Sequence, residues 1–154
     1  FITSSVSNFD SNANISFGSS GPSSGVTLNA ANIGVTTAGD YKVTYTVNFQ
    51  RGNGNGSHTF VLKKETSEIG GSSIFVSGGN GDINSVTKTK FVTLAAGETI
   101  SVFYKTGGTI ALLEGTSLSL ELIWVTAKTF FSQQITNKKP SNLLGFLFYI
   151  DFNY

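Results

Sequence analysis

Between residues 41 and 49 the chain alternates strictly between apolar and polar side chains. Tyr41, Val43, Tyr45, Val47 and Phe49 occupy every second position, and lysine, threonine and asparagine fill the positions between them. Because successive side chains of a β-strand point to opposite faces, this period of two predicts a strand with one buried face and one face in water. No long stretch shows a convincing helical period, so the sequence predicts an all-β protein.

Further strands follow the same pattern along the chain and are separated by turn signals. We expect them at residues 59–63, 70–76, 86–94, 100–104, 109–113 and 118–125, with turns at 39–40, 51–57, 78–82, 96–98, 105–108 and 114–115. The glycine-rich turn at 51–57 is predicted to join its two strands in a hairpin and to leave His58 exposed. Short strands at this spacing are typical of a β-sandwich or a closed barrel. The predicted core consists of Tyr41, Val43, Tyr45, Val47, Ile100, Val102, Leu118, Leu120 and Leu122.

Length and composition agree with one small β domain. The chain has 154 residues, of which only 12% are charged, against a usual share of about 25%. Glycine, serine, threonine and asparagine replace the charges, which favours strands and turns over salt-bridged surface helices. We expect the domain at residues 1–125, with a poorly determined N-terminal segment at 1–25 and a C-terminal extension at 126–154.

The charge pattern and the lack of cysteine exclude several classes of partner. Ten basic residues oppose nine acidic ones without forming a basic stripe, which argues against nucleic acid as a partner. The chain has no cysteine, so it can form neither a disulfide framework nor a thiolate metal site. No window reaches the roughly 18 consecutive apolar residues of a membrane-spanning helix, so no membrane span is expected.

Candidate catalytic residues are scarce. Nucleophilic catalysis needs a base beside a serine, threonine or cysteine, and the only histidine, His58, follows a turn. The acidic residues are scattered, so no carboxylate pair stands out for glycosidase chemistry. We therefore predict that the protein is not an enzyme, and a hydrolase is the least favoured alternative. Asn80, Asp82 and Asn84 offer oxygen atoms to calcium, but a single carboxylate favours an ordinary turn, and no cofactor is expected.

Several late strands carry apolar residues on both faces. The outward positions that should be polar include Phe103, Leu113, Ile123 and Val125. Exposed apolar area of this kind usually marks an interface, and closed homo-oligomers bury such patches around a symmetry axis. We predict that these four residues form a subunit contact. The alternative is that the C-terminal extension or the loops of the other sheet cover them within one chain.

Three short motifs resemble a known superfamily. Residues 38–47 resemble the Gly-x-Tyr strand of the jelly-roll superfamily shared by tumour necrosis factor and the globular heads of complement component one q. Residues 94–102 are similar to its Leu-x-x-Gly-Asp turn and strand, with Glu98 in place of aspartate, and Ser117–Ile123 resembles its terminal strand. In its composition, which is rich in serine, threonine, glycine and asparagine and free of cysteine, the sequence is most similar to the C-terminal domains of bacterial collagen-like surface proteins, such as exosporium filament glycoproteins.

The resemblance implies a jelly-roll sandwich of about ten strands that forms a compact homotrimer. It implies a trimerising head of an extracellular, spore-surface or virion-surface protein, which binds a host receptor or glycan or mediates adhesion. The alternatives are a phage or viral fibre tip and a lectin-like jelly roll in which Asn80, Asp82 and Asn84 contact sugar. The extension at 126–154 departs from the superfamily and could be an added strand, an interface arm or foreign sequence.

Overall fold

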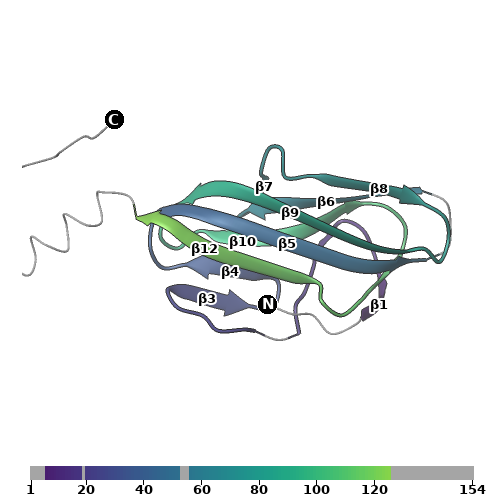
Figure 1. The fold of residues 1–154 in the computed structure, drawn as a ribbon, viewed down its shortest axis with the longest axis horizontal. Helices are drawn as coiled ribbons and strands as arrows, with labels where there is room; N and C mark the ends of the chain where they lie inside the picture. The colour runs from purple at the N-terminus through teal and green to yellow at the C-terminus, as the bar shows by residue number, and fades with distance from the viewer. Residues whose placement is uncertain (1–5, 19, 53–55, 126–154) are drawn as a thin grey trace, which may run out of the picture.

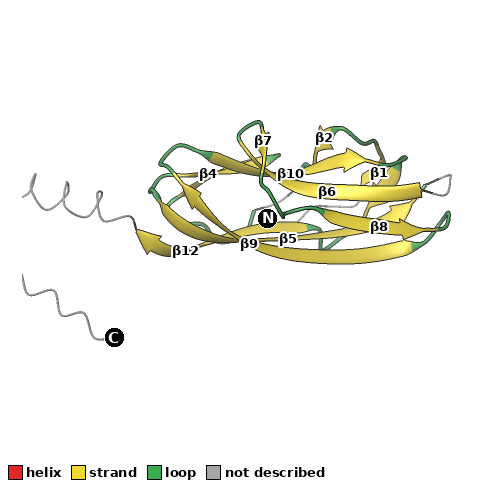
Figure 2. Cartoon of the chain, turned by 90° about the horizontal axis from the view of Figure 1, so that it is seen from above, coloured by secondary structure: helices red, strands yellow, loops and turns green. Residues whose placement is uncertain are grey.

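The computed structural model describes residues 6–18, 20–52 and 56–125, and every regular element in them is a β-strand. Two antiparallel sheets pack face to face as two layers (Figures 1 and 2). This arrangement confirms the predicted all-β sandwich. It contains twelve strands, where about ten were expected, because several of the connecting segments form short strands of their own.

The two sheets differ in size. The five-stranded sheet, here called the front sheet, comprises β1 (Val6–Phe9), β5 (Gly39–Arg51), β9 (Ile83–Leu94), β11 (Ile110–Leu112) and β12 (Ser117–Val125). The seven-stranded back sheet comprises β2 (Ala13–Asn14), β3 (Val26–Asn29), β4 (Asn32–Val35), β6 (Gly56–Lys64), β7 (Ser67–Glu68), β8 (Ile74–Gly78) and β10 (Thr99–Thr106).

The alternating strand predicted from the sequence is β5, and it lies at the centre of the front sheet. It pairs along its length with β9 on one side and with β12 and β11 in succession on the other. In the back sheet β10 lies between β4 and β6. The inward residues of β5, which are Tyr41 to Phe49 at every second position, therefore face the back sheet and are almost completely buried.

The core agrees with most of the prediction. Tyr41, Val43, Tyr45, Val47, Ile100, Val102 and Leu118 are all buried. Leu120 is only partly buried and packs against this core. The prediction for Leu122 was wrong, because its side chain is 42% exposed. Leu122 lies near the end of an edge strand, where the ladder with β5 shifts its register, so fewer neighbours cover it.

The predicted hairpin at 51–57 was also wrong. β5 belongs to the front sheet and β6 to the back sheet, so the chain crosses between the layers here instead of folding back on itself. His58 was expected to be exposed, but it is only 3% exposed. It occupies the same alternate positions of β6 as Phe60 and Leu62, which point into the core.

Other sequence predictions fall at the ends of the chain. The N-terminal segment contains β1, which pairs with β11, and β2, which pairs with β10. The extension at 126–154 lies outside the described residues. The described part of the chain contains no helix with the length and hydropathy needed to cross a membrane.

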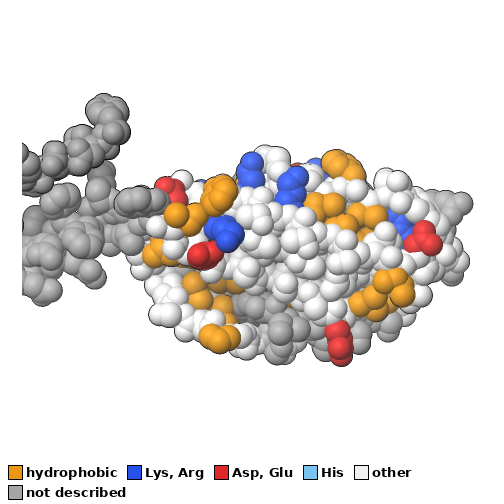
Figure 3. All heavy atoms as spheres, viewed as in Figure 1, with side chains coloured by type: hydrophobic (Ala, Val, Ile, Leu, Met, Phe, Trp, Pro, Cys, Tyr) orange, Lys and Arg blue, Asp and Glu red, His pale blue; other side chains and the backbone are white. Residues whose placement is uncertain are grey.

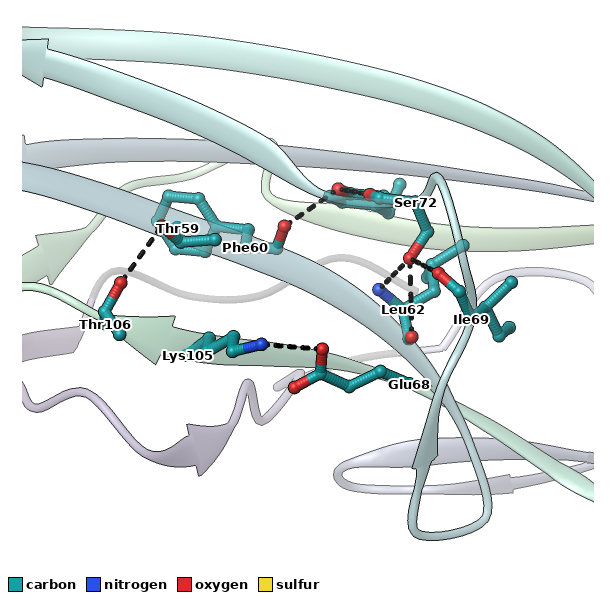
Figure 4. A network of polar contacts seen from close by, with 9 residues as sticks. Thr59, Phe60, Leu62, Glu68, Ile69, Ser72, Lys105 and Thr106 are labelled. Atoms are coloured by element: carbon teal, nitrogen blue, oxygen red, sulfur yellow. Dashed lines mark hydrogen bonds and ion pairs between the residues drawn. The ribbon is translucent and has the colours of Figure 1, made fainter.

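A buried serine connects the β7–β8 turn to the core (Figure 4). The Ser72 hydroxyl accepts a hydrogen bond from the Leu62 N–H at 3.0 Å and donates one to the Ile69 carbonyl at 2.7 Å. The Ser72 carbonyl in turn accepts a hydrogen bond from the Tyr45 hydroxyl at 2.6 Å. Burial of this phenol raises the pKa of Tyr45, which keeps it protonated as a donor.

We expect Ser72→Ala to lower the free energy of unfolding by about 1–3 kcal/mol, because the buried Leu62 N–H loses its acceptor, whereas the Ile69 carbonyl keeps its bond from the Ser72 N–H. Urea unfolding followed by circular dichroism measures this loss. Ser77→Ala is the matched control, since Ser77 is exposed on β8 and its replacement should change stability by less than about 0.5 kcal/mol. Equal losses for the two variants would contradict the proposed role of Ser72.

Candidate functional site

The outer face of the front sheet is a flat array of hydroxyl and amide side chains that bond to one another. Thr44 and Thr89 are joined by a hydrogen bond of 2.9 Å between their hydroxyls, and Thr46 and Thr87 by one of 2.8 Å. Next to them the Ser85 hydroxyl donates to the Asn48 side-chain oxygen at 2.6 Å. These pairs follow from the register, which sets β5 and β9 side by side with Thr44 opposite Thr89.

Exposed apolar side chains lie toward the two ends of this array. Phe91 is 67% exposed and lies opposite Lys42, whereas Ile83 is 71% exposed and lies opposite Gln50. Ile123, on β12, is 43% exposed. Figure 3 shows this face with a mainly white, polar and uncharged centre and orange groups toward both ends. Four of the five large exposed hydrophobic residues of the described chain therefore belong to β9 and β12 of the front sheet, and the fifth, Phe75, lies on β8 of the back sheet.

Two of the charged groups on this face form an ion pair, in which the Lys42 ammonium lies 3.0 Å from the Glu121 carboxylate. The Asp40 carboxylate accepts a hydrogen bond from the Thr93 hydroxyl at 2.6 Å and has no cationic partner among the described residues. These charges lie toward one end of the face, so its centre, where the hydroxyls bond to one another, is the part that can be buried at low cost.

The outer face of the back sheet differs, because two of its apolar residues, Phe103 and Val61, are covered within the chain, whereas Phe75 on β8 is 75% exposed. The Lys63 ammonium lies 3.2 Å from the centre of the Phe103 ring, which is a cation–π contact. Val61, opposite Phe103, is only 1% exposed. An ion pair between Lys105 and Glu68 at 2.8 Å joins β10 to β7 on the same sheet (Figure 4).

The predicted interface residues are therefore distributed over both sheets. Phe103 lies on the back sheet under Lys63, and Ile123 lies at the register shift of β12 in the front sheet, where it is 43% exposed. Leu113 follows β11 and is partly buried, and its N–H donates to the Asn48 carbonyl at 2.8 Å. The backbone of Val125 pairs with Gly39 at the end of β12, and its side chain lies outside the described part. Their role in a subunit contact stays a prediction.

Polar groups of the predicted calcium loop form hydrogen bonds with one another. The Asp82 carboxylate accepts a hydrogen bond from the Gly79 N–H at 2.7 Å, and the Asn84 amide donates to the Asp82 carbonyl at 3.3 Å. Asn80 is exposed at the tip of the turn. Among the described residues no three His, Cys, Asp or Glu side chains come together as a metal site, so calcium or sugar binding by this loop stays a prediction.

A cavity of about 100 Å³ lies at the opposite edge of the sandwich. β3, β4 and β12 contribute the apolar residues Val26, Leu28, Ile33, Leu118 and Leu120, and the remaining lining residues are Gly21, Pro22, Ser23 and Ser119. None of these side chains titrates, so the cavity offers neither a general acid nor a general base.

Sequence reasoning missed a buried polar cluster at one end of the sandwich, formed by Arg51, His58 and Tyr104 and here called the loop-end cluster. Arg51 is only 2% exposed and lies at the last position of β5. Its guanidinium donates to the carbonyls of Gly56 at 2.8 Å, Gly78 at 2.6 Å and Val76 at 2.7 Å, whereas its Nε has no partner. Alternation along β5 could have indicated that Arg51 is buried, because this residue continues the series of inward-pointing side chains.

His58 and Tyr104 form the second part of this cluster. His58 Nδ1 lies 2.5 Å from the Tyr104 hydroxyl, which also donates to the Gly108 carbonyl at 2.5 Å. Burial lowers the pKa of His58, and the charge of Arg51 lowers it further. Burial raises the pKa of Tyr104 to about 12. The cluster connects the ends of several strands, and none of its three residues lines the cavity between β3, β4 and β12.

Comparisons with known proteins support the fold. No protein-family model matches the chain, and no curated protein matches it. A structure of Eiger tumour necrosis factor from S. frugiperda is similar, with 17% identity and a TM-score of 0.65 over 79% of this chain and 87% of that one. The globular domain of the zebrafish complement 1qA protein has 14% identity and a TM-score of 0.57 over 81% of this chain and 95% of that one. At these identities the likeness shows a shared jelly-roll fold.

Proposed function

We propose that this chain is a self-associating globular head, assembled as a homotrimer through the outer face of the front sheet, and that it has no catalytic role. The observation that carries the proposal is the chemistry of that face. Its central hydroxyls bond to one another, Lys42 is paired with Glu121, and Ile83, Phe91 and Ile123 stay exposed beside them. A second copy of the chain is the occupant that fits, because burial would cover apolar surface and leave the central hydroxyls with their partners.

The number of subunits and the setting rest on resemblance. The short motifs resemble the superfamily of tumour necrosis factor and the complement heads, and the two similar structures are named as a tumour necrosis factor and a complement globular domain. Neither name describes an enzyme. We infer a head of a surface or fibre protein in an extracellular, spore-surface or virion-surface setting, where it binds a receptor or glycan or mediates adhesion.

Light scattering coupled to size-exclusion chromatography tests the assembly. The wild-type chain is expected to elute at three times the 16.3 kDa of one chain. A stable monomer at micromolar concentration would overturn the proposal. Circular dichroism of the same sample shows whether the chain is folded, so a monomer cannot be mistaken for unfolded protein.

We expect Phe91→Glu to weaken association about a hundredfold or more, because it removes an apolar ring and adds a second carboxylate beside the Lys42–Glu121 pair, and burying that excess charge costs roughly 3 kcal/mol or more. The readout is the concentration at which trimers dissociate, measured by analytical ultracentrifugation. Phe103→Glu is the matched control on the back sheet, where the new carboxylate lies beside Lys63 and trimers should persist. If Phe103→Glu dissociates the trimer and Phe91→Glu does not, the interface lies on the back sheet.

A further inference from the structure

The loop-end cluster holds the connection between β10 and β11 in place. Within this connection the Gly108 carbonyl accepts the Tyr104 hydroxyl at 2.5 Å, and the Thr109 carbonyl accepts the Gly52 N–H at 2.9 Å. The Thr109 hydroxyl donates to the Asp10 carboxylate at 2.7 Å. Residues 107–109, here called the latch segment, are therefore attached to the cluster, to the end of β5 and to the segment after β1.

The position of the protons in this cluster follows from its acceptors. A carbonyl oxygen can only accept, so the single Tyr104 hydroxyl hydrogen belongs to the bond with Gly108. His58 Nδ1 must then donate to the Tyr104 oxygen, which assigns the neutral tautomer that carries its hydrogen on Nδ1. A further proton can only bind at Nε2, and it turns the ring into a cation.

The closed structure, in which the latch segment is attached to the cluster, would accommodate that cation poorly. The His58 ring is stacked on Tyr104 at 5.8 Å and lies 5.5 Å from the ring of Phe49. The charged and titratable groups around it are Arg51 from β5, Tyr104 from β10 and Asp10 from the segment after β1, which is bonded to the latch segment.

The remaining nearby acid does not neutralise His58. Asp82, between β8 and β9, lies beside Gly78 and binds its own turn. No carboxylate of the described residues lies within ion-pair distance of His58. Protonated His58 would therefore add a second buried positive charge beside Arg51.

We infer that His58 is an acid-sensitive latch: its protonation releases the latch segment and opens this end of the sandwich, while the two sheets stay packed. Gly107 is the residue that must move, because its backbone lies directly against the Tyr104 hydroxyl and His58 Nδ1. Opening lets water reach the imidazolium, which removes the cost of burying it. The inference is independent of the proposed assembly, since none of these residues lies on the outer face of the front sheet.

The sign of the effect follows from linkage. The pKa of His58 is lower in the closed structure than the ordinary value of 6.5, so the open form takes up the proton first as the pH falls. The opening constant of the latch is therefore lowest and independent of pH above about pH 6.5, and it rises as the pH falls below that value, by up to about tenfold per pH unit for one linked proton. The rise ends once the pH passes below the pKa of the closed form.

Hydrogen exchange of the full chain between pH 8 and pH 5 tests the latch. After correction for intrinsic exchange rates, the amide of Gly52, which donates to the Thr109 carbonyl of the latch segment, should lose protection below pH 6.5, whereas that of Val43 in the core should not. In His58→Gln the Gly52 amide should show no such pH dependence. In Tyr104→Phe, which lacks the hydroxyl that joins His58 to Gly108, the latch segment should already be open at pH 8.

A second measurement does not depend on any variant folding. His58 is the only histidine, so its ring resonances can be followed by NMR without ambiguity in the wild-type chain. Titration below 6.5, in step with the shifts of the latch-segment amides, is the expected result. Titration at or above 6.5, latch amides that do not respond to pH, or an unchanged response in His58→Gln would each overturn the inference.

Discussion

Arg51→Met is expected to lower the free energy of unfolding by about 3 kcal/mol, because three carbonyls lose a charged donor and the loss of such a bond costs about 1–3 kcal/mol. The guanidinium donates to three carbonyls that belong to the ends of β6 and β8. Methionine fills much of the same volume but donates no hydrogen bond, so these partly buried carbonyls lose the guanidinium as a donor. Urea unfolding at a fixed protein concentration measures the loss, because self-association makes stability depend on concentration.

Lys105→Met is the matched control for this substitution. Lys105 also pairs across strands, but its side chain is 44% exposed and its ion pair with Glu68 is in contact with water. Exposed ion pairs of this kind contribute at most about 1 kcal/mol to the free energy of unfolding. If Arg51→Met costs no more than Lys105→Met, the buried guanidinium does not hold this end of the sandwich.

Gly107→Ala is expected to lower the free energy of unfolding by about 3 kcal/mol, from backbone strain and displaced hydrogen bonds together. Gly107 has φ of +143°, a conformation that residues with a Cβ rarely adopt. A Cβ there would overlap the Tyr104 hydroxyl and lie 2.5 Å from His58 Nδ1. Both groups are buried and bonded, so neither can move away without breaking the cluster.

Gly70→Ala controls for the general effect of replacing glycine. A Cβ at Gly70 meets nothing within 4 Å, and the backbone there does not have a positive φ. The alanine should be neutral or stabilise the fold by up to about 1 kcal/mol, because it restricts the unfolded chain. Thermal unfolding of both variants gives the comparison, and a similar midpoint for the two would contradict the crowding at Gly107.

Part of the candidate interface could be predicted from the sequence. Ile123 stood out because it falls on the polar face of an otherwise alternating strand. Phe91 could have been found in the same way, since it shares the parity of Thr87 and Thr89 on β9. That these threonines bond to Thr44 and Thr46 could not be predicted, because it depends on the register between strands about forty residues apart.

The loop-end cluster shows where local patterns mislead. The glycine-rich segment after Arg51 indicated an exposed hairpin, and composition therefore placed His58 in water. Alternation along β6 contained the opposite signal, because His58 shares the parity of the buried Phe60. Turn composition describes how a chain changes direction, but it does not say whether the next strand joins the same sheet or the opposite one.

By itself, the sequence determined the strands, most of their turns and the side of each strand that is buried. Those features depend on the alternation of apolar side chains and on backbone preferences, both of which are local. Only the tertiary structure decided that β5 pairs with β9 and not with β6, that Arg51 and His58 meet Tyr104, and that Phe91 and Ile123 share one sheet. These contacts join residues far apart in the chain, and they contribute to the stability of the fold only once the two sheets have packed.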